Sequence, residues 1–188
     1  MPDKRVFIAL HYTPSPEFIH FFTQMKKEMG TTGIKWTELH NLHLTLQFLG
    51  DTPEEGIREL SQELETIARN CHGFLFTPGK PGYFGAASSP RVIWMSLEEP
   101  SGRLALLANT VRDKTRSWTA GDDKPFLPHL TLARPKITME ASHIKKYMAE
   151  WAKIALPPVS VTQFHLIWST LTPRGPVYKN LRSFDLLP

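Results

Sequence analysis

Hydrophobic and polar positions repeat along the chain with two different periods, which together predict a mixture of strands and helices. Short apolar runs predict strands over residues 5–11, 42–49, 91–97, 127–133, 159–171 and 177–186. Between these runs, apolar residues spaced three and four apart predict amphipathic helices from Ser15 to about Met29, over Ile57–Cys71, over Leu104–Trp118 and up to about Trp151.

The two halves of the chain share this order of elements. A turn-rich stretch near residues 77–90, which contains Pro78, Pro81 and Gly82, separates them. At 188 residues, the chain has the length of one domain. We therefore expect residues 1–188 to form a single α+β or α/β domain of two similar lobes, with the seam of the chain near 77–90.

Composition narrows the class of protein. A single cysteine, Cys71, excludes an internal disulfide and a zinc finger and suits a reducing cytosol. No window approaches the ~18 consecutive apolar residues of a membrane span, and the apolar run after Arg5 is too short for a signal peptide. The net charge of +4 is compatible with an anionic partner such as RNA but does not select one. These features predict a cytoplasmic protein.

One tetrapeptide occurs twice. His43-Leu44-Thr45-Leu46 is repeated identically over His129–Leu132, and each copy lies in a predicted strand at the same place in its half. Because side chains alternate between the two faces of a strand, the leucines point to one face and the histidine and threonine to the other. The pattern predicts that the leucines anchor each strand to the core and that each His-Thr pair lines a surface or cleft.

His11-Tyr12-Thr13 serves as an internal control, because it also matches His-x-Thr but is followed by Pro14 and has no second copy. The short pattern alone therefore carries little information. The identical tetrapeptide, doubled in matching contexts, carries much more.

Two histidines that face one substrate suit a reaction that needs an acid and a base together, because the imidazole pKa of ~6.5 lies near neutrality. Phosphodiester cleavage is such a reaction, with one histidine activating the nucleophile and the other protonating the departing oxygen. Hydroxyls of Thr45 and Thr131 can then donate hydrogen bonds to the phosphate oxygens. From the residues alone, the two histidines are interchangeable in these roles.

The wider sequence resembles the two-histidine phosphoesterase superfamily, and within it the RNA 2′,3′-cyclic phosphodiesterase (2′–5′ RNA ligase) family. The resemblance rests on the doubled motif, Asn41–Asp51, Phe84-Gly85, Arg91–Trp94 and Pro125–Arg134, and it runs from about Arg5 to Leu186. It implies an α+β, duplicated bilobal fold, in which two antiparallel-rich sheets face each other across a central cleft with helices outside.

The resemblance also implies an activity, which is hydrolysis of a terminal 2′,3′-cyclic phosphate to a 2′-phosphate without a metal or other cofactor, with reversible 2′–5′ ligation as a secondary reaction. It makes His43 the proton donor and His129 the proton acceptor. It implies substrate binding by Thr45, Thr131, Arg134, as a phosphate contact, and Phe48, as a stacking partner for a base. The implied partners are RNA 3′ ends with a cyclic phosphate, tRNA halves among them, bound by a monomer away from any membrane.

Strand parity alone gives other expectations for two of these residues. Arg134 has the opposite parity to His129, so a bulge or the strand end must redirect it toward the cleft. Phe48 shares the parity of the leucines, which favours packing in the core. Lys80, Lys124 and Arg174 lie in turn-rich segments, where solvated charge is a simpler explanation than an RNA-binding edge.

Three other functions remain open at this stage. A related phosphodiesterase acting on small cyclic nucleotides or 2′–5′ oligonucleotides would use the same residues. A metallohydrolase would use histidines as ligands, and His40 lies three residues before His43, but no third ligand with zinc spacing is evident. A non-catalytic RNA-binding protein is disfavoured, because binding alone does not need two matched histidines.

Overall fold

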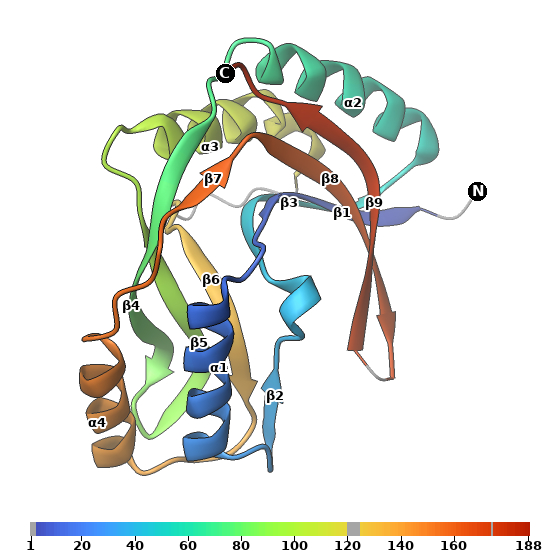
Figure 1. Ribbon diagram of the computed structural model, residues 1–188. Coiled ribbons are helices and arrows are strands. Elements are labelled where there is room, and N and C mark those ends of the chain that lie inside the picture. Colours follow the sequence, from blue (N-terminus) through green and yellow to red (C-terminus); the bar gives the residue numbers. More distant parts are fainter. Residues whose placement is uncertain (1–2, 120–124, 174) are drawn as a thin grey trace.

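The computed structural model describes residues 3–119, 125–173 and 175–188, which form an α+β fold built on two sheets (Figure 1). In the first sheet the strands lie in the order β3 (His43–Thr52), β1 (Lys4–His11), β8 (Gln163–Thr172) and β9 (Gly175–Asp185). In the second sheet the order is β2 (Ile34–Trp36), β6 (His129–Pro135), β5 (Ser89–Glu98), β4 (Phe74–Ala86) and β7 (Val159–Val161). Neighbouring strands in both sheets pair antiparallel, which confirms the predicted fold class.

Helices cover the outside of both sheets, as expected. Figure 1 shows α2 (Glu54–Ala68) and α3 (Arg103–Lys114) above the first sheet, and α1 (Pro16–Met29) and α4 (Ala141–Trp151) beside the second. Two short 3₁₀ helices, η1 (Leu39–Asn41) and η2 (Arg116–Trp118), complete the described elements. None of the helices in the described ranges is both long enough and apolar enough to cross a membrane.

The sequence of α1 explains where this helix begins and which of its faces is buried. The Ser15 hydroxyl accepts a hydrogen bond from the Phe18 backbone N–H at 3.2 Å, and Pro16 occupies the first turn, where its missing N–H costs nothing. Phe18, Phe21, Phe22 and Met25 follow at helical spacing and are buried. Cys71, three residues after α2, is also buried, as its place on that apolar face predicted.

The stretch near residues 77–90, which we expected to consist of turns, lies mostly in β4 and the start of β5. The pairing of β4 with β5 shifts between Pro78 and Pro81, where prolines cannot donate to the ladder. At Gly82 an added Cβ would lie 2.5 Å from the Trp94 ring, so only glycine fits there. The proline and glycine signals therefore mark an irregular strand, not a loop.

Long-range pairing mixes the two halves of the chain. Strands β8 and β9, from the C-terminal half, join β1 and β3, whereas β2, from the N-terminal half, joins β6. The predicted strand over 159–171 is in fact two strands in different sheets, β7 and β8. Hydrophobic periodicity marks a strand but not its partner, so neither result was visible in the sequence.

The main core is one contiguous cluster, which contains residues from both sheets and from helices α1, α2, α3 and α4. A second, smaller cluster consists of Phe7, Ala9 and Ile167, with Tyr178 packed against them. Phe7 and Ala9 alternate along β1 with Val6, Ile8 and Leu10 of the main core. The smaller cluster therefore occupies the opposite face of the first sheet, and this is the face that carries His43.

Candidate active site

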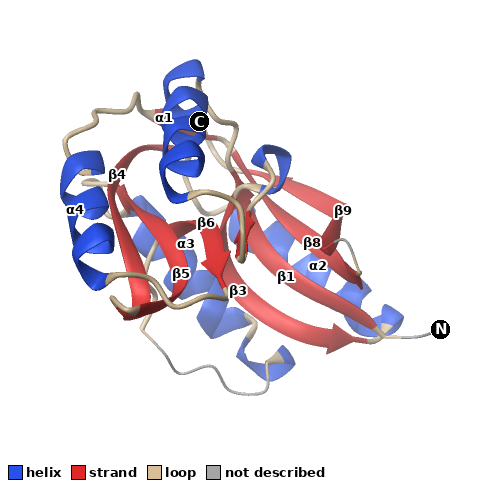
Figure 2. Cartoon of the chain, turned by 90° about the horizontal axis from the view of Figure 1, so that it is seen from below, coloured by secondary structure: helices blue, strands red, loops and turns tan. Residues whose placement is uncertain are grey.

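The two copies of the tetrapeptide have the same local environment. Over the first seven residues of β3 and over all of β6, burial follows the same sequence, with the leucines buried and the histidine and threonine partly exposed. This confirms the prediction from strand parity. The two strands contact each other, and Figure 2 shows β3 and β6 side by side where the sheets meet.

Each copy also contains a β-bulge at its fourth residue. In β3 the register skips Leu46, since Ala9 pairs with Thr45 and Ile8 with Gln47. In β6 it skips Leu132, since Trp94 pairs with Thr131 and Ile93 with Ala133. A bulge inserts one residue and so reverses the alternation of side chains beyond it.

The bulges decide where the fifth residue after each histidine points. Gln47 is buried, and Phe48 is 48% exposed, so the expectation of core packing for Phe48 is wrong. Its ring stacks on Phe7 with centroids 5.3 Å apart, on the face that carries His43. Arg134 occupies the equivalent position in β6 and is exposed. The bulge that its parity required is present.

Both histidines are held by the same hydrogen bond. His43 Nδ1 lies 2.7 Å from the carbonyl oxygen of Asn41, and His129 Nδ1 lies 2.7 Å from that of Leu127. A carbonyl oxygen only accepts, so Nδ1 carries a proton in each ring and donates it. When neutral, each imidazole therefore presents an unprotonated Nε2, which is the atom that can exchange a proton with a substrate.

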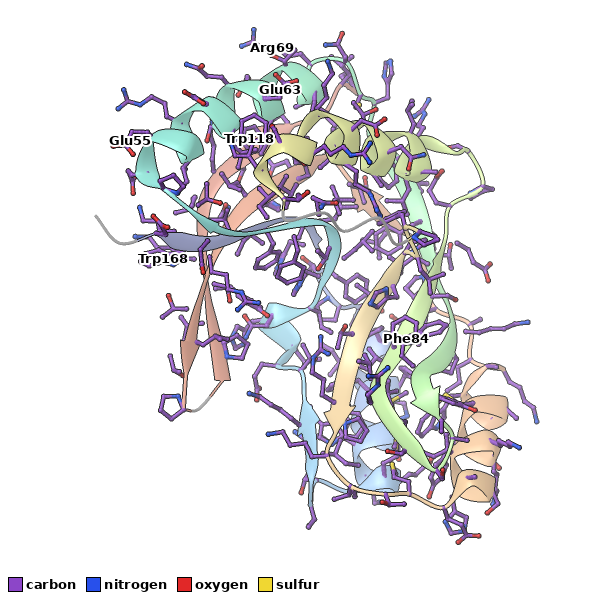
Figure 3. The ribbon with its side chains drawn as sticks, turned by 180° about the vertical axis from the view of Figure 1, so that it is seen from behind. Glu55, Glu63, Arg69, Phe84, Trp118 and Trp168 are labelled. Atoms are coloured by element: carbon purple, nitrogen blue, oxygen red, sulfur yellow. The ribbon has the colours of Figure 1, made fainter. Side chains whose placement is uncertain are left out.

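Aromatic rings support each imidazole edge-on. The His43 ring lies 5.3 Å from Tyr178 at an interplanar angle of 88° and 5.0 Å from Phe7. The His129 ring lies 5.3 Å from Phe84, also at 88°, and 6.3 Å from Trp94. Figure 3 labels Phe84 on β4. These contacts limit rotation of the imidazoles and so help to fix the direction of Nε2.

Electrostatic interactions link site residues of the first sheet to those of the second sheet. Burial is the largest cause of a lowered pKa for His43; the hydrogen bond to Asn41 opposes it, and the nearby His11, His129 and Arg134 lower the pKa further. Burial raises the pKa of Tyr178, and Arg134 opposes that shift. His129 and Arg134 of the second sheet therefore lie close enough to His43 for their charges to be felt there.

The two threonines lie on the same faces as their histidines and are partly exposed. Within the described part of the chain, no hydrogen bond ties either hydroxyl to another residue, so both can bind a ligand. Of the basic residues considered earlier, Lys80 is exposed on β4. Lys124 and Arg174 lie outside the described residues.

His43 lines a cavity of about 300 Å³, together with residues that the sequence did not connect with it. Three further histidines, His11, His40 and His165, line it with Tyr178 and Asn180. His11 pairs directly with His43 across β1 and β3, and His165 pairs with Ala9 across β8 and β1. Only knowledge of this strand pairing could have placed His11 and His165 beside His43, because both lie far from it in the sequence.

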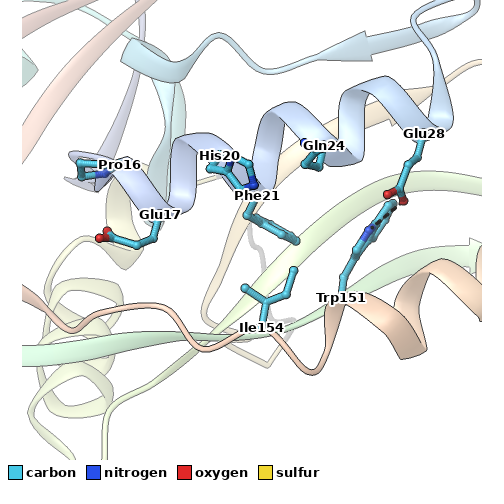
Figure 4. Close-up of a pocket in the computed structure, with 8 residues that line it drawn as sticks. All are labelled: Pro16, Glu17, His20, Phe21, Gln24, Glu28, Trp151 and Ile154. Carbon is cyan, nitrogen blue, oxygen red and sulfur yellow. Dashed lines mark hydrogen bonds between the residues drawn. The ribbon is translucent and has the colours of Figure 1, made fainter.

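A larger cavity, of about 610 Å³, lies elsewhere on the molecule, and Figure 4 shows it between α1 and the residues around the end of α4. Its walls include Phe21, Glu28 and Trp151, and Trp151 Nε1 donates to Glu28 at 3.2 Å. No predicted site residue lines it. Size alone would therefore select this cavity, whereas the doubled motif favours the smaller one, which His43 lines.

Metal binding was one of the alternatives. Across the described ranges, no three or more His, Cys, Asp or Glu side chains are grouped in a way that could hold a metal ion. The four histidines of the smaller cavity are thus not arranged as a ligand set, and His40 and His43 gain no third ligand there.

Comparisons with known proteins agree with this geometry. The family model described as LigT like Phosphoesterase matches the chain twice, over residues 13–94 and 96–178, so that each match contains one copy of the motif. An RNA 2′,3′-cyclic phosphodiesterase of Archaeoglobus fulgidus is 35% identical over 168 residues, which cover 86% of this chain and 89% of that protein.

Two further matches extend the comparison. An RNA 2′,3′-cyclic phosphodiesterase of Thermotoga maritima is 36% identical over 163 residues, 84% of this chain and 80% of that one. The crystal structure of E. coli LigT complexed with 3′-AMP matches with a TM-score of 0.73 and 26% identity, covering 100% of both chains. With its two motifs, its two sheets and these relatives, the chain belongs to the LigT-like phosphoesterase family.

Proposed function

We propose that this protein hydrolyses the 2′,3′-cyclic phosphate at the 3′ end of an RNA to a 2′-phosphate, by metal-independent acid–base catalysis. The observation that carries the proposal is the matched pair of histidines, each fixed through Nδ1 to a carbonyl oxygen and each with Nε2 left for the substrate. The names of the relatives, and the 3′-AMP bound in the related structure, support the same substrate class.

In this mechanism His129 acts as the base and His43 as the acid. Nε2 of neutral His129 takes a proton from water while the water oxygen attacks phosphorus. The bond between phosphorus and O3′ breaks, and Nε2–H of protonated His43 supplies a proton to O3′. The product carries a 2′-phosphate and a free 3′ hydroxyl. Exchange of protons with solvent then restores both histidines.

The phosphate oxygens carry the charge that builds up in this step. Thr45 and Thr131 donate hydrogen bonds to them from the two sides, and the Arg134 guanidinium adds a positive charge. Phe48, held on Phe7, provides a flat surface on which the terminal base stacks. Each of these residues lies on the same face of its strand as the histidine that it assists.

The lowered pKa of His43 fits the acid role only with substrate in place. In the free protein, burial and the neighbouring positive charges favour the neutral imidazole. A bound phosphate places negative charge beside Nε2, which favours the protonated form. Substrate binding therefore prepares His43 to donate a proton.

We also propose that residues 1–188 act as one domain of two similar lobes and as a monomer in the cytoplasm, with tRNA halves among the substrates. We propose in addition a reversible ligation, in which the 5′ hydroxyl of a second RNA takes the place of water, its oxygen attacks phosphorus and O3′ leaves with a proton, which gives a 2′–5′ linkage. Incubation of RNA carrying both ends, followed by analysis of the linkage, tests this ligation.

The decisive experiment uses an RNA that ends in a 2′,3′-cyclic phosphate, incubated with the protein in excess EDTA. We expect hydrolysis to a 2′-phosphate. Loss of activity in EDTA would favour a metallohydrolase, binding without turnover would favour a non-catalytic RNA-binding protein, and a 3′-phosphate product would overturn the assigned direction of cleavage. Hydrolysis of small cyclic nucleotides but not of RNA would favour the related phosphodiesterase.

A further inference from the structure

His43 lies beside two parts of the first sheet that differ in character, and Tyr178 belongs to both of them. The first is an aromatic cluster, in which the exposed ring of Phe48 stacks on buried Phe7 and Tyr178 packs against the same ring. The second is the cavity of about 300 Å³ that contains His11, His165 and Asn180. The aromatic cluster is suited to a base, and the cavity has a role that the proposed reaction leaves unassigned.

The residues lining this cavity favour an anion. They include four imidazoles, two amides and a phenol, and none of them carries a carboxylate. Nitrogen donors without a competing carboxylate are what phosphate oxygens require. The volume of about 300 Å³ exceeds that of a single water site and accommodates a phosphate group.

The contacts of His165, which lines this cavity, favour the tautomer with its proton on Nε2. The Asn180 amide nitrogen donates to Ser183 Oγ at 2.9 Å, and Ser183 Oγ lies 2.9 Å from His165 Nδ1. The same amide nitrogen, which can only donate, lies 3.4 Å from His165 Nδ1. Nδ1 therefore accepts, and the proton of the neutral ring resides on Nε2. This arrangement is the reverse of that in His43 and His129.

The charge state of His165 agrees with this role. Burial is the main cause of its lowered pKa, and His11 lowers it further. A neutral imidazole with a proton on Nε2 remains a hydrogen-bond donor at neutral pH. His165 thus offers a donor of fixed direction, whereas the catalytic histidines offer an acceptor when they are neutral.

The proposed reaction determines which part of the RNA lies here. Water attacks from the His129 side, in line with the departing O3′, so the ribose that carries O3′ lies on the His43 side. The terminal nucleotide and the chain that precedes it therefore lie over the first sheet. With the terminal base stacked on Phe48 and the cyclic phosphate at His43, the cavity beside His43 is within reach of the 5′ side of that ribose.

We propose that the cavity lined by His11, His165 and Asn180 binds the phosphate on the 5′ side of the terminal nucleotide, that is, the last phosphodiester of the RNA. His165 donates to it through Nε2, His11 lies beside it, and Asn180 and Ser183 act as positioning residues that set the tautomer of His165. This subsite rests on the proposed function and specifies its substrate as an RNA end in preference to a cyclic mononucleotide.

The minimal test compares a nucleoside 2′,3′-cyclic phosphate with the same compound carrying a 5′-phosphate. We expect the 5′-phosphate to raise kcat/KM about tenfold, as one hydrogen bond to a charged group does. His165→Ala should bring this ratio close to one, and His165→Gln, whose amide can still donate, should keep part of it. The matched control is His143→Ala, an exposed histidine of α4, which should keep the full ratio.

A second measurement needs no variant. A dinucleotide with a cyclic end and a neutral methylphosphonate linkage should lose the advantage of the natural linkage, whereas removal of the upstream base should not. Equal kcat/KM with and without the 5′-phosphate, or an advantage that follows the upstream base, would overturn the subsite alone. Failure to hydrolyse any of these cyclic phosphates would instead overturn the proposed function, and the subsite with it.

Discussion

Strands β3 and β6 present one tetrapeptide twice with nearly the same local structure. In both, the histidine donates through Nδ1 to the carbonyl two residues before it, a ring lies edge-on at 5.3 Å, and the leucine at the fourth position forms a bulge. The identity of the two copies thus goes with one structural task, which is to hold each imidazole through Nδ1 and leave Nε2 available.

The two strands differ beyond the bulge, and the difference gives the site its direction. The equivalent positions hold Phe48 in β3 and Arg134 in β6. His43 is surrounded by Phe7, Tyr178 and further histidines, whereas His129 lies against Phe84 and Trp94. Identical histidines therefore acquire different neighbours, one side suited to a base and ribose and the other supplying a cation to the phosphate.

Removing either histidine should have the largest effect. We expect His43→Ala and His129→Ala each to lower kcat for a 2′,3′-cyclic phosphate by at least ~100-fold, which is the lower limit for the contribution of a positioned acid or base. His20→Ala, an exposed histidine on α1, is the matched control and should retain full activity. A folded variant of His43 or His129 with near-normal turnover would contradict the assigned roles.

Substitution of Arg134 should rank second. Arg134→Ala removes a charge-assisted contact to the phosphate, and we expect kcat/KM to fall roughly 30-fold. Arg134→Lys keeps the charge but not the planar guanidinium and should fall less. Steady-state kinetics of the two variants test this, and an Arg134→Ala enzyme as active as the parent would place the arginine outside the reaction.

Phe48 should contribute less than Arg134, because stacking on a base is weaker than a contact to the reacting phosphate. We expect Phe48→Ala to raise KM about fivefold with little change in kcat. Phe48→Tyr keeps the ring and should behave like the parent. The account would be wrong on this point if kcat fell while KM stayed the same, since stacking on the base does not involve the reacting atoms.

The smallest predicted effect is a shift in the pH profile. A pair that needs one protonated and one neutral group gives a bell-shaped profile, and the lower of the two pKa values sets its acidic limb, whichever group has which role. Burial lowers the pKa of His43, so the acidic limb of kcat/KM should lie below the ordinary range of histidine.

Substitution of Arg134 tests the direction in which the acidic limb of the pH profile moves. Its charge lowers the pKa of His43, so Arg134→Ala should raise that pKa and move the acidic limb to higher pH. Arg134→Lys retains the charge and should leave the limb in place. A limb that does not move in Arg134→Ala, or that moves to lower pH, would show that His43 does not set it.

The sequence predicted the parts of the site that depend on local geometry. Alternation along a strand is enough to place His43 and Thr45 on one face and Leu44 on the other, and the repeat selected two of eight histidines as catalytic candidates. The same rule failed for Phe48, because a bulge at Leu46 depends on pairing with β1, which alternation does not reveal. Arg134 was anticipated from the family resemblance, and its parity then required a bulge or the strand end to redirect it.

Long-range pairing accounts for the remaining differences. His11, His165 and Asn180 come together only because β8 and β9 return to pair with β1, across more than half of the chain. The proline and glycine residues of β4 indicated turns, since an irregular strand and a loop share the same residue types. The cavity beside His43 was therefore invisible in the sequence.

The central claim is that His43 and His129 act together on one phosphate, and a double-mutant cycle tests it most directly. Single-turnover rates would be measured for His43→Ala, His129→Ala and the double variant on the same RNA with a cyclic end. Residues that act as a unit are strongly non-additive, so we predict that the double variant loses little more than the worse single variant. Losses that multiply in the double variant would contradict the claim, because they would mean that the two histidines act independently.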